Sequence, residues 1–165
     1  MTEDARFTAI PEAIARFTAN ETVLVVAEIP GLECRYCAPA SLVTGPYISW
    51  LTRRSESPVL VAVHDERLDE LGINLVSRNT TEASLRRPFF TETVDLKDEH
   101  RPESPQGQAA TMRALGDLNY VAADFSTPGI VRPLRATEGG VLRRAGFAEA
   151  GVDLARLAGL PPVAV

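Results

Sequence analysis

Two short segments of this chain hold the residues whose types and spacing could do chemistry. The first is Glu33-Cys34-Arg35-Tyr36-Cys37, which contains both cysteines of the 165-residue chain beside a carboxylate. A carboxylate that a Pro/Gly loop holds away from water can have a raised pKa and act as a general base. Glu33 is therefore a candidate catalytic base, and the alternative is a plain, solvent-exposed loop acid.

Cys34 and Cys37 form a Cys-x-x-Cys motif, a spacing that elsewhere belongs to redox centres or to half of a zinc site. No second pair and no nearby histidine completes a zinc set in this sequence. Two interpretations stay open. The thiols are ordinary reduced cysteines, or they take part in redox sensing or nucleophilic catalysis beside Glu33.

The second segment surrounds the expected start of the last helix. Arg144 precedes that helix, whose first free amide groups favour an anion, so Arg144 is a candidate substrate-binding residue. The alternative is a surface arginine paired with a carboxylate. Glu149, in the first turn of that helix, could contact the substrate with Asp153 one turn later. Capping and the helix dipole offer a simpler explanation of Glu149.

Composition and charge exclude several classes of function. The 17 basic and 22 acidic residues give a net charge of −5, which disfavours binding to nucleic acid or to anionic membranes. Lys97 is the only lysine and lies in a polar run, so Schiff-base chemistry has almost no candidate. No apolar run approaches the roughly 20 residues of a spanning helix, and the first residues are acidic, so we expect a cytoplasmic protein.

Hydrophobic periodicity and turn residues predict alternating helices and strands within one domain, residues 1–165. The alternation predicts an α/β fold of the α+β type, in which helices flank a mixed β-sheet. The expected helices are residues 11–19, 44–53, 66–71, 105–115 and 148–158, and the expected strands are residues 22–27, 59–63, 89–96 and 130–136.

Three local expectations concern how the strands are placed. Residues 22–27 form a continuous aliphatic run, which predicts a strand covered on both faces at the centre of the sheet. Residues 29–40 contain prolines and a glycine, which predict a loop. Pro133 interrupts the strand at residues 130–136 and places it near an edge.

The C-terminal third closely resembles one family. The matching residues are Pro133-Leu134-Arg135-Ala136, then residues 139–150 and residues 152–161. They are similar to 3,4-dihydroxy-2-butanone 4-phosphate synthase, an enzyme of riboflavin synthesis that converts ribulose 5-phosphate to a four-carbon ketone phosphate and formate. The resemblance implies that Arg144 matches the family arginine that holds the substrate phosphate.

Weaker matches continue upstream in the same order. Phe90-Thr91 and residues 111–115 follow the family pattern, and residues 100–108 lie over its substrate segment, in which Ser104 is retained. The resemblance therefore adds Thr91 and Ser104 to the candidate substrate-binding residues. It also implies a homodimer with its sites at the subunit boundary, because the resembled family is dimeric.

Residues 28–35 depart from the acidic loop that the family carries after its first strand. The resemblance places the family's metal-binding glutamate at Gly31 and the histidine that is its second metal ligand at Phe147. It thereby makes Phe147 a candidate substrate-binding residue, as an apolar wall in place of the metal. Glycine and phenylalanine offer no oxygen ligand to a hard cation such as Mg²⁺. We therefore expect no metal and no cofactor at this position, and only a small-molecule substrate as a ligand.

These departures lead to an expectation about function. We expect a divergent, metal-independent homologue of the synthase with a rebuilt pocket, acting as a lyase, isomerase or cyclase of specialised metabolism. The competing class is a non-catalytic pseudoenzyme that binds a small ligand or a partner protein. A standard riboflavin-pathway enzyme is the third and least favoured interpretation.

Overall fold

The computed structural model describes residues 7–27, 33–55, 57–77 and 88–165. Its helices are α1 (Ile10–Thr18), α2 (Gly45–Arg54), α3 (Asp65–Glu70), α4 (Pro105–Gly116) and α5 (Phe147–Leu157). Its strands are β1 (Val23–Ala27), β2 (Glu33–Cys37), β3 (Val61–His64), β4 (Phe89–Phe90), β5 (Val94–Leu96), β6 (Phe125–Val131), β7 (Pro133–Ala136) and β8 (Val163–Ala164).

A four-stranded mixed sheet forms the centre of the protein, in the order β4-β7-β3-β8. Strands β3 and β7 are parallel, with Ala62 opposite Leu134, whereas β4 and β8 are antiparallel to their neighbours. The predicted class, a mixed sheet flanked by helices, is confirmed. Pro133 lies in β7, which was expected near an edge and is the second strand of the sheet, paired on both sides with β4 and β3.

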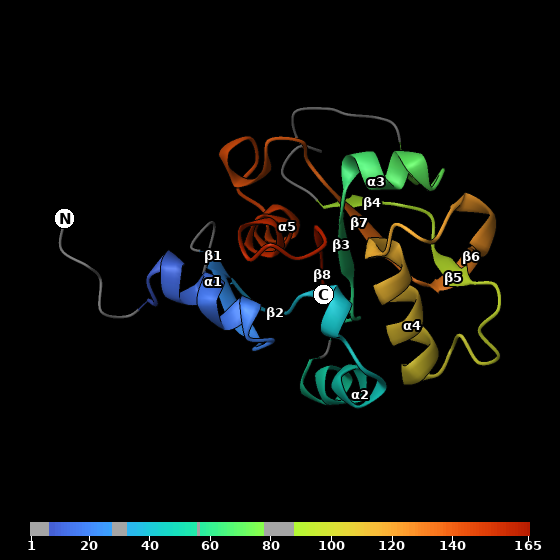
Figure 1. Ribbon diagram of the computed structural model, residues 1–165, viewed down its shortest axis with the longest axis horizontal. Helices are drawn as coiled ribbons and strands as arrows, with labels where there is room; N and C mark the ends of the chain where they lie inside the picture. The colour runs from blue at the N-terminus through green and yellow to red at the C-terminus, as the bar shows by residue number, and fades with distance from the viewer. Residues whose placement is uncertain (1–6, 28–32, 56, 78–87) are drawn as a thin grey trace.

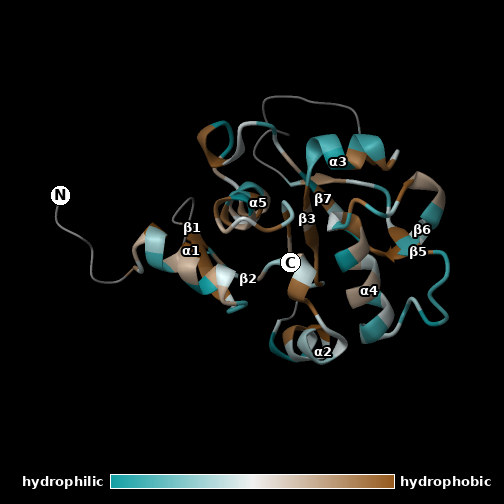
Figure 2. Ribbon diagram, in the orientation of Figure 1, coloured by the Kyte–Doolittle hydropathy of each residue, from teal (hydrophilic) through white to brown (hydrophobic). Residues whose placement is uncertain are grey.

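Helices cover both faces of this sheet (Figure 1), with α5 on one side and α4 on the other. Successive residues of β3 therefore face different cores. Val61 and Val63 pack into the larger cluster with α2 and α4, while Ala62 packs with Leu134 and Val152 beneath α5. Figure 2 shows the hydrophobic colour concentrated on the inner strands, whereas α3 is mostly hydrophilic.

Strands β1 and β2 form a separate antiparallel pair beside α1, with Val25 opposite Arg35. Two sequence expectations are corrected here. The strand at residues 22–27 does not lie in the central sheet, and Leu24 is exposed. The segment predicted as a loop contains β2, because pairing with β1 satisfies its backbone groups and overrides the local turn residues. Residues 28–32, which include Pro30 and Gly31, lie outside the described residues.

The predicted strand at residues 89–96 is two strands with different partners. Strand β4 pairs with β7, and β5 pairs with β6 in another two-stranded sheet. The helix starts agree better with the sequence, since Thr44 caps α2 and Ser104 caps α4 through their side chains.

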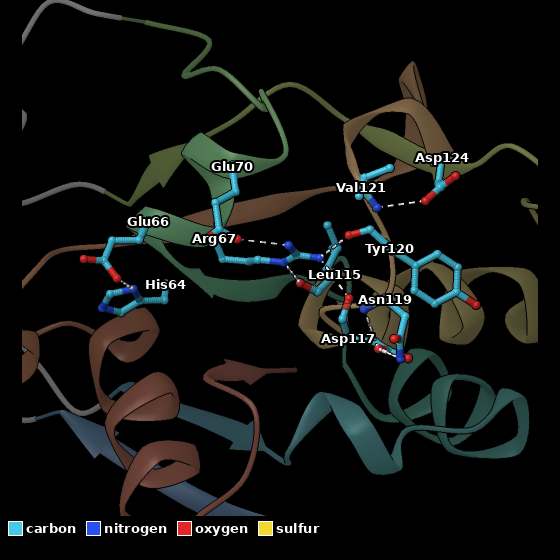
Figure 3. Close-up of polar contacts among 10 residues, drawn as sticks. All are labelled: His64, Glu66, Arg67, Glu70, Leu115, Asp117, Asn119, Tyr120, Val121 and Asp124. Atoms are coloured by element: carbon cyan, nitrogen blue, oxygen red, sulfur yellow. Dashed lines mark hydrogen bonds and ion pairs between the residues drawn. The ribbon is translucent and has the colours of Figure 1, made fainter.

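Arg67 of α3 is buried, which the sequence analysis did not predict. Its guanidinium donates to the main-chain oxygens of Leu115, Asp117 and Tyr120 and pairs with Glu70 (Figure 3). These oxygens belong to the end of α4 and the turn after it, where carbonyl groups lack helical partners. Arg67 therefore joins α3 to α4, a structural role.

Candidate functional site

The amino end of α5 carries a buried ion pair. The Nη1 atom of Arg144 lies 2.7 Å from Oε2 of Glu149, and the Arg144 and Glu149 side chains are 14% and 0% exposed. The other carboxylate oxygen of Glu149 accepts a hydrogen bond of 2.9 Å from the backbone N–H of Thr137, at the end of β7. The Phe89 ring of β4 lies 5.1 Å from the Arg144 guanidinium. Four chain segments thus meet at one arginine.

Glycines and α5 carboxylates shape the turn that leads to Arg144. Gly139 and Gly140 adopt positive φ angles of 85° and 61°, which side chains rarely adopt. The Asp153 side chain accepts a hydrogen bond of 2.9 Å from the backbone N–H of Val141. A side chain at Gly146 would clash with Oε2 of the Glu149 carboxylate, because its Cβ would lie well inside van der Waals contact. Glycine at position 146 therefore leaves room for the ion pair.

A second ion pair lies on β2, and it faces the same helix end. The Nη2 atom of Arg35 is 3.3 Å from Oε2 of Glu33, and both side chains are about half exposed, at 51% and 54%. The Arg35 guanidinium also lies over the Phe147 ring, 5.1 Å from its centroid. The apolar wall expected at Phe147 is therefore covered by a cation, and sequence reasoning missed Arg35.

The environment expected for Glu33 is wrong in one respect. The expectation required a carboxylate removed from water, whereas Glu33 is half exposed and paired with Arg35. A role as a base stays a prediction.

The two cysteines do not form a pair. Cys34 is exposed, while Cys37 is buried among Phe17, Ala155 and Ala164. Residues three apart on a strand point to opposite faces, which separates the thiols. Burial raises the pKa of the Cys37 thiol to about 12, so it is protonated at neutral pH. The expectation that Cys37 is catalytic is corrected to a core residue, and a role for Cys34 stays a prediction.

Thr91 and Ser104 have structural partners away from α5. The Thr91 hydroxyl is buried within 3.0 Å of the main-chain oxygen of Pro133, on β7. The Ser104 hydroxyl donates to the main-chain oxygen of Arg101 and accepts from the N–H of Gly107. Their local geometry explains both residues without a substrate.

Of the predicted substrate-binding residues, Arg144, Phe147 and Glu149 come together, and Glu149 is too deeply buried to contact a ligand in this conformation. The sequence left open an ion pair between Arg144 and a carboxylate, but it did not identify that carboxylate as Glu149. No helix within the described ranges is long and apolar enough to cross a membrane. The expected cytoplasmic location stays a prediction.

Fold and site together define a class, an α+β protein with a mixed central sheet and an arginine at the start of a helix that packs on it. The family model of 3,4-dihydroxy-2-butanone 4-phosphate synthase matches residues 11–165. The chain belongs to this family, as the sequence resemblance predicted.

Curated relatives are similar along nearly the whole chain. The probable bifunctional riboflavin biosynthesis protein RIBA 1, chloroplastic, of Oryza sativa is 38% identical over 161 residues, which cover 96% of this chain and 30% of the relative. The riboflavin biosynthesis protein RibBA of Chlorobium phaeovibrioides is 38% identical over 165 residues, covering 98% of this chain and 40% of the relative. The chain thus spans less than half the length of these relatives.

Solved structures of the synthase have the same fold. One in complex with two magnesium ions has a TM-score of 0.88 and 32% identity, covering 96% of this chain and 74% of that one. A structure of the Candida albicans synthase has a TM-score of 0.84 and 31% identity, covering 96% of this chain and 78% of that one.

These comparisons overturn the functional expectation. Proteins named for riboflavin biosynthesis are 35–38% identical across 96–98% of the chain, which points to a standard riboflavin-pathway synthase. The expectation of a divergent enzyme of specialised metabolism, or of a pseudoenzyme, is wrong. That expectation rested on departures at a few positions, such as Gly31 and Phe147, whereas the similarity extends along nearly the whole chain.

Because one of these structures contains two magnesium ions, we asked whether the residues of this chain could bind Mg²⁺. Mg²⁺ requires several oxygen ligands in octahedral order. Among the described residues no three His, Cys, Asp or Glu side chains gather in a way that could hold a metal. Phe147 carries a ring under the Arg35 guanidinium where the resemblance expects a ligand, and Gly31 lies outside the described ranges. The described residues do not fit a magnesium ion here.

Proposed function

We propose that this chain acts in riboflavin biosynthesis as a 3,4-dihydroxy-2-butanone 4-phosphate synthase. Its substrate is then ribulose 5-phosphate, and its products are the four-carbon ketone phosphate and formate. The observation that carries the proposal is 35–38% identity over nearly the whole chain to proteins named for riboflavin biosynthesis. The proposal concerns this reaction alone, because those relatives are much longer than this chain.

Arg144 is the residue to which we assign the substrate phosphate. An arginine guanidinium can hold a phosphate through two parallel hydrogen bonds. Arg144 stands just before α5, an 11-residue helix that starts at Phe147 without a side-chain cap at Gly146. The amide groups and dipole of such a helix end favour an anion, which supports the assignment.

We assign proton transfer to Glu33 and stabilisation of negative charge to Arg35. A ketose phosphate reacts when a base removes a proton next to its carbonyl group, and negative charge then develops on the carbonyl oxygen. Glu33 is a carboxylate within 3.3 Å of the Arg35 guanidinium, which itself lies against Phe147, close in sequence to Arg144. A base and a cation are thus neighbours, and the cation lies against the first residue of the helix that Arg144 precedes.

The test is formate release from ribulose 5-phosphate by the purified chain, coupled to formate dehydrogenase and run with Mg²⁺ present and again with chelator. We expect turnover at roughly 1 per second or faster in at least one condition. Arg144→Met should raise KM at least tenfold, because a charge-assisted hydrogen bond contributes about 1.5 to 3 kcal/mol. Arg143→Met is the matched control, since Arg143 is exposed, and should behave as wild type.

Absence of formate in both conditions, from protein that is folded by circular dichroism, would contradict the proposal. Equal effects of Arg143→Met and Arg144→Met would contradict the phosphate assignment alone.

We also propose that the chain forms a homodimer. Large apolar side chains are exposed on α1 and on the β1–β2 pair, namely Ile10, Leu24 and Tyr36. A second copy that covered them would remove apolar surface from water. Light scattering at tens of micromolar should give the mass of two chains, and the mass of one chain would contradict this proposal.

A further inference from the structure

Glu149 is the one fully buried carboxylate among the described residues, and its contacts lead away from its own helix. One oxygen accepts from Arg144 and the other from the backbone of Thr137, at 2.7 and 2.9 Å. A carboxylate that only capped α5 would accept from the first amide groups of that helix. Glu149 instead connects the end of β7 to the arginine before α5.

We infer that Glu149 is a positioning residue, which holds the Arg144 guanidinium in the orientation that receives a phosphate. The inference rests on the proposed function, because that function gives Arg144 its ligand. Burial makes the contact strong, since a buried charge without a partner is costly. Arg144 therefore keeps its contact with Glu149 when a ligand arrives.

The surroundings of the pair restrict the guanidinium further. The Phe89 ring lies 5.1 Å from it, and the missing side chain at Gly146 leaves the space that the two charged groups fill. A residue held by a carboxylate, a ring and the backbone loses little conformational entropy when it binds a ligand. Fixing Arg144 in this way favours binding even though Glu149 is itself an anion.

Asp153 supplies a matched control on the same helix. It accepts a hydrogen bond of 2.9 Å from the backbone N–H of Val141, much as Glu149 accepts from Thr137. Both carboxylates brace the turn between β7 and α5, but only Glu149 contacts Arg144. A purely structural role would make Asp153→Asn and Glu149→Gln alike.

The experiment is a double-mutant cycle read by calorimetric titration with inorganic phosphate. Glu149→Gln should weaken phosphate affinity about tenfold, because a single amide oxygen cannot serve both Arg144 and Thr137 as the carboxylate does. Arg144→Met should weaken it at least as much, and adding Glu149→Gln to that variant should change affinity less than twofold. Asp153→Asn should stay within twofold of wild type.

Each other outcome overturns the inference. Unchanged or tighter phosphate binding by Glu149→Gln would mean that the carboxylate merely neutralises Arg144. Additive losses in the double variant, or an equal loss in Asp153→Asn, would mean a general effect on the fold. Absence of phosphate binding by wild type would overturn it as well. Formate release by wild type is scored separately, so the proposed function can fail while the cycle succeeds.

Discussion

The two arginine–glutamate pairs near the start of α5 have the same chemistry and opposite surroundings. The Arg144–Glu149 pair is 14% and 0% exposed, with 2.7 Å between the charged atoms. The Arg35–Glu33 pair is 51% and 54% exposed, with 3.3 Å between them. The buried pair is fixed by β4, β7 and α5, whereas the exposed pair lies on a two-stranded hairpin.

The difference in exposure gives the two ion pairs different physical properties. Water screens an exposed pair, which contributes little to stability and can rearrange around a substrate. Loss of one partner of a buried pair costs stability, because the other charge is left without compensation. The buried pair is therefore held in place by its surroundings, whereas water competes for the groups of the exposed pair.

Removing each glutamate should give the largest contrast in stability. Glu149→Leu leaves Arg144 buried without its carboxylate, and we expect a loss of about 3 to 5 kcal/mol in the free energy of unfolding. Glu33→Leu should change it by at most about 0.5 kcal/mol. Urea denaturation of both variants measures the two values. Similar losses would show that the pairs do not differ in the way described.

The two cysteines extend the same contrast between a buried and an exposed site. The Cys37 pKa is raised to about 12 by burial, whereas Cys34 is exposed. At pH 8 iodoacetamide should alkylate Cys34 at least about a hundredfold faster than Cys37, since the thiolate is the nucleophile. Mass spectrometry of the labelled peptides measures both rates, and comparable rates would place Cys37 outside the core.

Cys37 also predicts the direction of a pH effect on stability. Its folded pKa lies above the unfolded value near 9, so its contribution is complete below pH 9 and is lost as the pH rises toward 12. The free energy of unfolding should fall by at most about 1.4 kcal/mol per pH unit over this range. Cys37→Ala should flatten that fall, and an unchanged slope in the variant would exclude Cys37 as its source.

A methyl group at position 146 should disturb only the buried pair. The Cβ of Gly146→Ala would clash with Glu149 Oε2 and lie 2.7 Å from Arg144 Nη1, so both groups must move. We expect a loss of about 1 to 3 kcal/mol, typical of overpacking. Ala145→Ser, at the exposed neighbouring position, is the control. A neutral Gly146→Ala would mean that the pair is loosely held.

The smallest effect should come from the exposed pair. Arg35→Gln removes a contact with the Phe147 ring and a screened ion pair, together about 0.5 to 1 kcal/mol. Thermal unfolding at low and high salt checks this, because the difference should shrink with salt. A loss above about 2 kcal/mol would show that Arg35 is structurally fixed.

Local signals in the sequence predicted the helices well and the strand partners poorly. Thr44 and Ser104 cap α2 and α4 through contacts within a few residues, and such contacts can be inferred from sequence. Strand β2 owes its form to β1, and β4 and β5 pair with different strands, which no local pattern encodes. The predictions therefore failed where the pairing of strands distant in sequence, and not the local sequence, sets the structure.

The candidate site shows the same division. Arg144 was predicted from its family resemblance and its place before a helix. The burial of Glu149 depends on a turn that brings Thr137 and Arg144 to it, and the cover of Phe147 depends on a hairpin that was predicted as a loop. Neither arrangement can be derived from spacing along the chain.

Genetic complementation tests directly whether the chain acts as a synthase in riboflavin biosynthesis. The chain is expressed in a bacterium that lacks its own 3,4-dihydroxy-2-butanone 4-phosphate synthase and needs added riboflavin to grow. We expect growth without riboflavin, and loss of that growth with Arg144→Met but not with Arg143→Met. Failure of the wild-type chain to support growth, while it accumulates as folded protein, would contradict a role in riboflavin biosynthesis.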